Sequence, residues 1–378
     1  MTDPGANGDR RHIHPESGIL SGGASEQRVQ RPEPDAPTEP WTELPTANLD
    51  DPTYYDRPLL KEAVWISAVP VYFWAGGASG AAATLAAVAQ IADRDGLDGL
   101  IKRARWVAAA GGAAGTALLI VDLGKPSRFA NMLRVFRPSS PMSVGSWVLA
   151  GAAPLAAGSA VLHDAGALGG VAEAAGLAIG VLGMPLAGYT SVLLSNTAVP
   201  LWQEVRRTLP ALFLSSAVIS AASVLQMFDL DERELDIVRR YGTAGKVADL
   251  VASQAVRRNA SRIHQVGSPL HAGLSGALWK ASEALIAASL ALSMVPGNRG
   301  RGRRVVEGLL GTAGSLAMRF AVFHAGKASS RDPRATFRHQ RGGHGGTEAT
   351  GRAAVTGPED LRAVATRDER TPGRTAVS

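Results

Sequence analysis

Apolar residues in this chain are gathered in long runs, and the charged residues lie between the runs and at both ends. An α-helix needs roughly 20 apolar residues to cross the hydrocarbon core of a bilayer. No run alternates as membrane β-strands do. The pattern therefore predicts an all-α, multi-pass transmembrane bundle of seven clear spans, at about 64–91, 104–121, 144–162, 171–194, 209–228, 272–295 and 305–323.

Residues 229–266 do not fit this pattern. Residues 229–240 are highly charged and are expected in water. Residues 244–256 have the apolar spacing of a helix but include Lys246 and Asp249. A span here would be short and degraded, so we favour a helix that lies at the interface or packs against the bundle. The choice between seven and eight spans stays open.

The two ends of the chain lack the apolar content of a folded core. Residues 1–53 are rich in Pro, Glu, Asp and Gly, and residues 327–378 are rich in Arg, Gly and Thr. Such compositions predict disordered tails on either side of a bundle at 54–326. The N-terminal segment has no apolar core and does not resemble a secretory signal peptide.

Composition narrows the chemistry. The chain has 378 residues, of which 46% are hydrophobic, 19% are charged and 43 are Gly, so close helix packing is expected. It has no Cys, which excludes disulfides, Cys-ligated iron–sulfur clusters and covalently attached haem in this chain. The net charge of +6 suits an anionic membrane surface, and no nucleic-acid motif is present. A redox role would need a partner that brings electrons.

The stretch 121–147, between the second and third predicted spans, organises the chain. Gly124 and Pro126 are expected to stop the incoming helix, because Gly adopts unusual backbone angles and Pro cannot donate to the previous turn. Pro138 and Pro141 are expected to keep the chain non-helical until the next span begins at residue 144.

Charges are concentrated at the start of this stretch. Asp122 falls at the negative end of a helix dipole, which is unfavourable for an anion. Lys125, Arg128 and Arg134 are cations that could compensate it, and we expect a pair with Arg128 or Lys125. The alternative is a solvated turn whose cations anchor it to lipid headgroups.

The same stretch resembles the signature of the NrfD family, the polysulfide-reductase-type (PsrC-like) membrane subunits of molybdenum and iron–sulfur oxidoreductases. The resemblance covers roughly residues 54–340. It is carried in order by YYDRPLLKEAVW at 54–65, DLGKPSRF at 122–129, FRPSSPMSVGSW at 136–147, GYTSVLLSNTAVPLW at 188–202 and RFAVFHAGKASSRDP at 319–333.

The resemblance implies a function. The chain would be the integral anchor and quinone-reactive subunit of a larger oxidoreductase in the cell membrane. It would exchange electrons between a ferredoxin-like iron–sulfur subunit and the quinone pool, with menaquinone or ubiquinone as its substrate. A molybdenum or tungsten catalytic subunit would complete the complex, and no haem or iron–sulfur cluster is expected in this chain. The alternatives are a membrane transporter, for which we find no internal repeat, and a purely structural anchor without quinone binding.

Tyr189 is the first candidate for a quinone contact. It lies in the apolar fourth span, where a buried hydroxyl needs a partner, and Asn196 follows two turns later on the same face. The resemblance implies that a Tyr at about this place helps to hold a quinone. The alternative is a hydrogen bond from Tyr189 to a backbone carbonyl freed by Pro185.

Other candidates are at the ends of spans. Trp65, Tyr72 and Trp74 in the first span are interface anchors or pocket walls, and Glu62 just before it is a proton relay or a solvated charge. Asp122 joins Tyr189, Asn196, Glu62 and Trp65 in the hypothetical quinone and proton-relay set. Lys125, Arg128, Arg134 and Trp147 form the expected structural or partner loop.

Histidines offer one further alternative. A haem b site would need two His that face each other from two spans. His163, His271 and His324 all fall near predicted span ends, and for His324 we favour a partly exposed interfacial position. No catalytic or metal-ligating residue is expected in this chain.

Overall fold

The computed structural model describes residues 12–13, 20–21, 60–296 and 300–336. The chain divides into two units, Met1–Thr46 and Ala47–Ser378. In the first unit the described residues form an antiparallel pair, β1 (His12–Ile13) with β2 (Leu20–Ser21). The disorder predicted for residues 1–53 and 327–378 concerns positions that lie mostly outside the described residues, but residues 327–336 are described and largely helical, so the prediction is wrong there.

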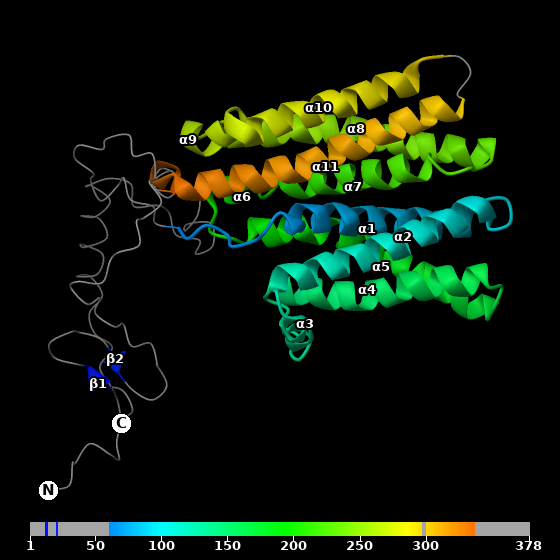
Figure 1. Ribbon diagram of the computed structural model, residues 1–378, viewed down its shortest axis with the longest axis horizontal. Coiled ribbons are helices and arrows are strands. Elements are labelled where there is room, and N and C mark those ends of the chain that lie inside the picture. The colour runs from blue at the N-terminus through cyan, green and yellow to red at the C-terminus, as the bar shows by residue number, and fades with distance from the viewer. Residues whose placement is uncertain (1–11, 14–19, 22–59, 297–299, 337–378) are drawn as a thin grey trace, which may run out of the picture. The chain divides into compact units, whose positions relative to one another are not determined.

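The second unit contains a bundle of long helices in two halves (Figure 1). The first half consists of α1 (Ala68–Asp93), α2 (Asp98–Leu123), α4 (Pro141–Asp164) and α5 (Gly169–Ser195). The second half consists of α7 (Leu209–Leu225), α8 (Glu232–Ala260), α10 (Gly273–Met294) and α11 (Arg301–Arg331). Four short helices lie in the connections between the long ones. Within the first half this is α3 (Pro126–Met132), between the halves α6 (Pro200–Glu204), and within the second half α9 (His264–Gly267) and the 3₁₀ helix η2 (Ser268–Leu270).

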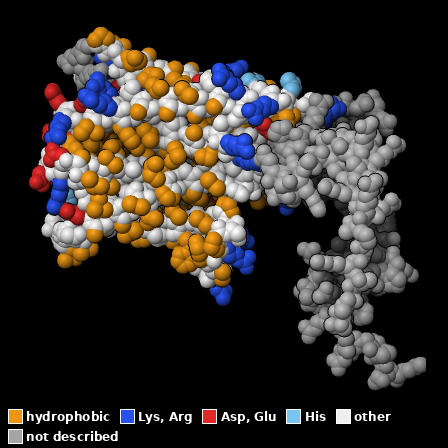
Figure 2. Space-filling model, turned by 180° about the vertical axis from the view of Figure 1, so that it is seen from behind, with side chains coloured by type: hydrophobic (Ala, Val, Ile, Leu, Met, Phe, Trp, Pro, Cys, Tyr) orange, Lys and Arg blue, Asp and Glu red, His pale blue; other side chains and the backbone are white. Residues whose placement is uncertain are grey.

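Six of the described helices, α1, α2, α4, α5, α10 and α11, are long and apolar enough to cross a membrane. The prediction of an all-α, multi-pass membrane bundle is confirmed. The expected count of seven spans is one more than this, because α7, at the place of the fifth span, is apolar but has only 17 residues. Hydrophobic side chains cover the middle of the bundle surface, and charged ones gather towards its two ends (Figure 2).

The ambiguous region forms one 29-residue helix, α8, which packs beside α7 and α10. Most of the segment 229–240, which was expected in water, therefore forms the first turns of α8. In the middle of α8 polar side chains point inward, with Lys246 and Asp249 buried, whereas Val247 and Val251 are 48% and 66% exposed. This arrangement is the reverse of a soluble amphipathic helix, in which the apolar face is buried. Of the two expectations for this region, packing against the bundle is the one observed.

Close packing of the first half depends on small residues. A Cβ atom added to Gly80 of α1 would lie 2.3 Å from the carbonyl oxygen of Gly183 in α5. A Cβ atom on Gly180 would lie 2.1 Å from Ala87 Cβ. These helices approach so closely that no larger residue fits at the crossing, as expected for membrane helices that associate by van der Waals contact.

Several expected boundaries are wrong, among them the start of the second span, which was expected at 104 and lies at Asp98. The stretch before the third span is not wholly non-helical, since it contains α3, and α4 begins at Pro141 instead of Val144. Pro fits the first turn of a helix, where its missing N–H is not needed, and the Ser140 side chain caps α4 by accepting from the Ser143 amide. At the C-terminal side, α11 continues to Arg331, past the expected boundary at 327.

Candidate functional site

A cavity of about 80 Å³ lies within the first half, where α1 and the segment before it meet α2, α3, α4 and α5. Its lining is mostly apolar, with a few polar groups. Three candidates from the sequence, Trp65, Asp122 and Tyr189, contribute to it together. The full lining is Trp65, Val69, Tyr72, Phe73, Leu119, Asp122, Leu123, Met132, Met142, Ser146, Tyr189 and Leu193.

Tyr189 is held against α4 by a glycine of the organising stretch. A Cβ atom on Gly145 would lie 2.1 Å from the Tyr189 ring, so only Gly allows the ring to pack there. Within the described part of the chain, no hydrogen bond to Tyr189 Oη is present, and the alternative of a bond to a carbonyl freed by Pro185 is not observed. The resulting position leaves the hydroxyl available to the cavity.

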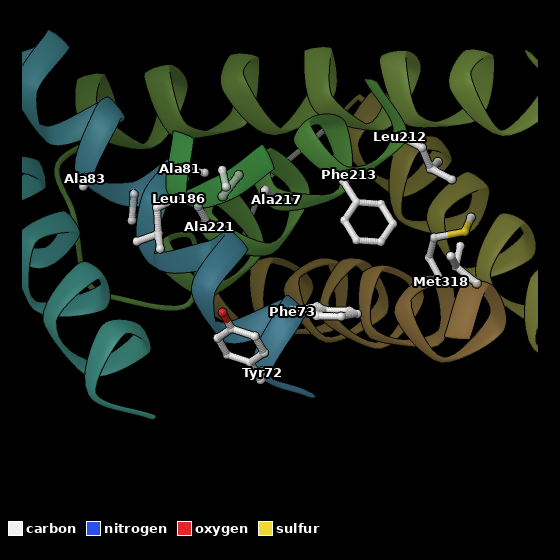
Figure 3. Close-up of a cluster of buried hydrophobic side chains, with 14 of the residues drawn as sticks. Tyr72, Phe73, Ala81, Ala83, Leu186, Leu212, Phe213, Ala217, Ala221 and Met318 are labelled. Carbon is white, nitrogen blue, oxygen red and sulfur yellow. The ribbon is translucent and has the colours of Figure 1, made fainter. Parts of the chain in front are cut away.

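Tyr72 of α1 contributes a second hydroxyl. Its Oη is buried and has no hydrogen-bond partner among the described residues. Figure 3 shows Tyr72 beside Phe73, which packs against Phe213 of α7 with ring centroids 6.1 Å apart. A buried tyrosine hydroxyl normally finds a partner. Tyr72 and Tyr189 therefore supply two donors to a mainly apolar cavity.

Trp65 forms one wall of the cavity, and residues of α6 and α11 hold its ring in place. Its ring stacks on Trp202 of α6, with centroids 5.9 Å apart and planes at 20°. Trp202 is fully buried and donates from Nε1 to the Val322 carbonyl of α11 at 3.0 Å. A Cβ atom on Gly326 would lie 2.1 Å from the Trp202 ring. The wall position of Trp65 is thus fixed through α6 and α11.

Glu62 lies next to this wall but does not line the cavity. Its carboxylate lies 2.6 Å from Arg331 Nε and 3.0 Å from Lys327 Nζ. Lys327 also donates to the Trp65 carbonyl at 3.2 Å. Partial burial opposes ionisation of Glu62, but the hydrogen bonds and charges of Arg331 and Lys327 outweigh it and lower its pKa below the usual range. Glu62 therefore ties the segment before α1 to α11 as a charged group.

Asp122 is stabilised in a way that the sequence did not suggest. Its carboxylate accepts a hydrogen bond from the Ile66 amide at 3.1 Å, just before α1 begins, and no ion pair with Arg128 or Lys125 occurs in the described structure. The positive N-terminal end of α1 thus compensates an anion at the negative end of α2. Arg128 instead donates to the Leu123 carbonyl at 2.8 Å and caps the end of α2.

The remaining candidates lie outside the cavity. Asn196 is exposed at the end of α5, where its amide donates to the Val192 carbonyl, so the two-turn spacing from Tyr189 does not bring it to the cavity. Lys125 and Arg134 are exposed on the loop around α3. Trp147 is 42% exposed and packs edge-on against Phe136.

His163 lies in the last turn of α4, whereas His324 is partly exposed within α11, before its last turn. His163 Nε2 lies 3.1 Å from Asp98 Oδ1, and His324 stacks on Phe320. In the part of the chain that the structure describes, no group of three or more His, Asp or Glu side chains is arranged to hold a metal ion.

Sequence reasoning missed several buried charges. Arg105, at the start of the second predicted span, is 1% exposed and donates to Gln90 Oε1 at 2.7 Å. Lys246, Asp249 and Arg319 are buried in the second half. The available signal was a charged residue within a helical, otherwise apolar pattern, which in a membrane helix faces the interior.

These features define a multi-pass helical membrane protein with a small, mainly apolar cavity near one end of its first half. Residues 59–234 match the family model of NrfD, described as polysulphide reductase, NrfD. The match supports the NrfD assignment carried by the motifs up to residue 202, and the motif at 319–333 lies beyond it. It includes all of the first half and α7 and ends in the first turn of α8. No curated protein matches the chain.

Proposed function

We propose that this chain is the quinone-reactive membrane subunit of a multi-subunit oxidoreductase and that the cavity binds the quinone ring. The observation that carries the proposal is the pair of tyrosine hydroxyls, on Tyr72 and Tyr189, in one mainly apolar cavity beside Trp65. A quinone ring is flat and apolar on its faces and has two carbonyl oxygens that accept hydrogen bonds. Hydroxyl donors set among apolar and aromatic walls match that chemistry.

A quinone that takes up two electrons and two protons becomes a quinol. This chain has no Cys, so clusters ligated by cysteine thiolates would belong to a partner. The family implies a ferredoxin-like iron–sulfur subunit and a molybdenum or tungsten catalytic subunit. The exposed cations Lys125 and Arg134, on the loop that carries α3 beside the cavity, are suited to an acidic partner surface.

Quinone binding separates this proposal from a transporter or a purely structural anchor. The test uses the full chain, purified in detergent with any partners that accompany it, and titrated with a short-chain quinone while tryptophan fluorescence is recorded. Bound quinone is expected to quench Trp65. Replacement of Tyr72 and Tyr189 by Phe keeps both rings and removes both donors.

Each lost hydrogen bond is expected to cost about 1 kcal/mol, or roughly fivefold in affinity. The matched control is Tyr241→Phe, which removes a hydroxyl that donates to the Ala81 carbonyl away from the cavity. Equal affinities of the unaltered chain, the double variant and the control would exclude the cavity as the quinone site. Quenching that is absent even in the unaltered chain would favour a structural anchor.

A further inference from the structure

Cations from separate segments converge at one end of the second half. An open hollow of about 520 Å³ lies where the last turns of α8 meet the residue that follows η2. Figure 2 shows Lys, Arg and His side chains gathered at one end of the bundle surface. Among the described residues no Asp or Glu lines the hollow, and its lining is Gln254, Arg257, Arg258, Ser261, Arg262 and His271.

The inner wall of the hollow is fixed by α10. Arg257 is partly buried, and its Nη1 lies 3.3 Å from a carboxylate oxygen of Glu283. The other oxygen of Glu283 accepts from Trp279 Nε1 at 3.1 Å, and Arg257 Nη2 donates to Gln254 Oε1 at 2.8 Å. The charge of Arg257 is therefore balanced within the protein.

The outer cations of the hollow are not balanced in this way. Arg258, Arg262 and His271 are exposed, and no ion pair to any of them occurs in the part of the chain that the structure describes. The negative end of the α8 dipole favours Arg258 in the last turn, but Arg262 and His271 lie beyond the end of the helix. Arg258 and Arg262 are four positions apart, a spacing at which like charges repel. An anion held between them would remove this repulsion.

An exposed apolar stripe of α8 leads to the hollow. Val247 and Val251 are 48% and 66% exposed. Gln254 and Arg258 continue the same three- and four-residue spacing, so all four side chains share one face of the helix. Leu274, at the start of α10, is 62% exposed. A ligand that fits both the stripe and the hollow has an anionic head and an apolar tail.

We propose that the hollow binds the headgroup of an anionic phospholipid, whose acyl chains lie along Val247 and Val251. The guanidinium groups of Arg258 and Arg262 present planar sets of N–H donors that match a phosphate. Basic pockets between membrane helices hold anionic headgroups in the same way. An acidic protein surface would match the cations but not the apolar stripe. The site is independent of the proposed quinone function.

The bound lipid has a structural role at this end of the bundle. It joins the last turn of α8, through Arg258, to the segment before α10, through His271. A ligand that binds the folded chain and not the unfolded chain raises the apparent stability. An anionic phospholipid is therefore expected to raise the unfolding temperature of the chain, and a zwitterionic phospholipid is not.

The test uses the full chain, purified in detergent and freed of lipid. Phosphatidylglycerol or phosphatidylcholine with identical acyl chains is added, bound lipid is counted by mass spectrometry of the intact protein, and thermal unfolding is recorded. The informative variant is the double change Arg258→Gln and Arg262→Gln, at two exposed positions. The matched control is Lys125→Gln with Arg134→Gln, which removes the same number of exposed charges around α3, at the same end of the bundle as α9 (Figure 1).

The unaltered chain and the control are expected to retain phosphatidylglycerol several-fold better than phosphatidylcholine, and the Arg258→Gln, Arg262→Gln variant to lose this preference. No preference in the unaltered chain, or an equal loss in the variant and the control, would overturn the site, since only general attraction between charges would remain. Displacement of the lipid by an equal concentration of glycerol 3-phosphate would also overturn it, because an anion without tails would then suffice. Unchanged lipid retention in the variant, together with release of a co-purified acidic subunit, would assign the hollow to a protein partner instead.

Discussion

The two halves of the bundle differ in the side chains that dominate their interiors, although the first half also buries Arg105 and the second half also contains close glycine contacts. The first half brings helices together through Gly and Ala, as where Gly80 meets Gly183, and leaves an apolar cavity. The second half places Ser hydroxyls and charges inside, as where Ser220 donates to Ser315 and Lys246 pairs with Glu307. The difference shows that one membrane bundle can use two kinds of interior. Close backbone contact shapes a cavity in the first half, and polar side chains hold buried charges in the second.

The largest expected effect tests the charged interior of the second half. Lys246→Met leaves the Glu307 carboxylate buried without its cation, which costs about 3–5 kcal/mol. Thermal unfolding of the detergent-solubilised chain measures the loss, and adding Glu307→Met should recover most of it. A double variant that is no more stable than the single one would show that the pair does not stabilise the bundle through mutual compensation.

A smaller effect tests the small-residue contacts of the first half. Gly80→Ala forces a Cβ atom against the backbone of Gly183, and overpacking of this kind costs about 1–3 kcal/mol. Gly76→Ala is the matched control on the same helix, because a Cβ atom there meets no heavy atom within 4 Å. Similar unfolding temperatures for the two variants would mean that the α1–α5 contact can relax without cost.

The third prediction concerns the cavity and depends on the proposed quinone site. Gly145→Ala should displace the Tyr189 ring and weaken quinone quenching several-fold, with a smaller loss of stability than Gly80→Ala. Gly151→Ala, on the same helix with open space around its Cβ position, should leave quenching unchanged. Unchanged quenching in both variants would argue that the Tyr189 position does not govern binding.

The smallest effect is the pH dependence of the link between Glu62 and α11. Because the pKa of Glu62 is lower in the folded chain than its usual 4.5, the stabilisation is present above that value and is lost as the pH falls through the folded pKa. Unfolding measured between neutral and acid pH should show a loss that Glu62→Gln removes. An identical acid profile for the variant would assign the loss to other groups.

The sequence predicted the fold well where hydrophobicity is uniform around a helix. It identified the apolar helices of the first half and placed Trp65, Asp122 and Tyr189 in one functional set, and the cavity brings those three together. It could not place α8, because average hydropathy does not record which face of a helix is polar. The Asp122 partner was also hidden, because the Ile66 amide lies 56 positions away in the chain.

Asn196 shows the limit of spacing arguments. Seven residues correspond to two helical turns, which indicates a shared face with Tyr189 only while the helix continues. Asn196 lies at the C-cap of α5 and its side chain folds back onto the Val192 carbonyl. The role of Gly145 was missed for a related reason, since the contact that requires Gly is made by a ring on another helix.

The inward polar side chains in the middle of α8 have a consequence for biogenesis. During synthesis Lys246 leaves the ribosome 61 residues before Glu307, the carboxylate that neutralises it. A lysine at the centre of an isolated helix opposes insertion by about 3 kcal/mol. The first half can therefore enter the bilayer helix by helix, whereas α8 has to wait beside α7 or at the membrane surface until α11 is made. Maturation of this protein should accordingly end with one cooperative step, the closure of its second half.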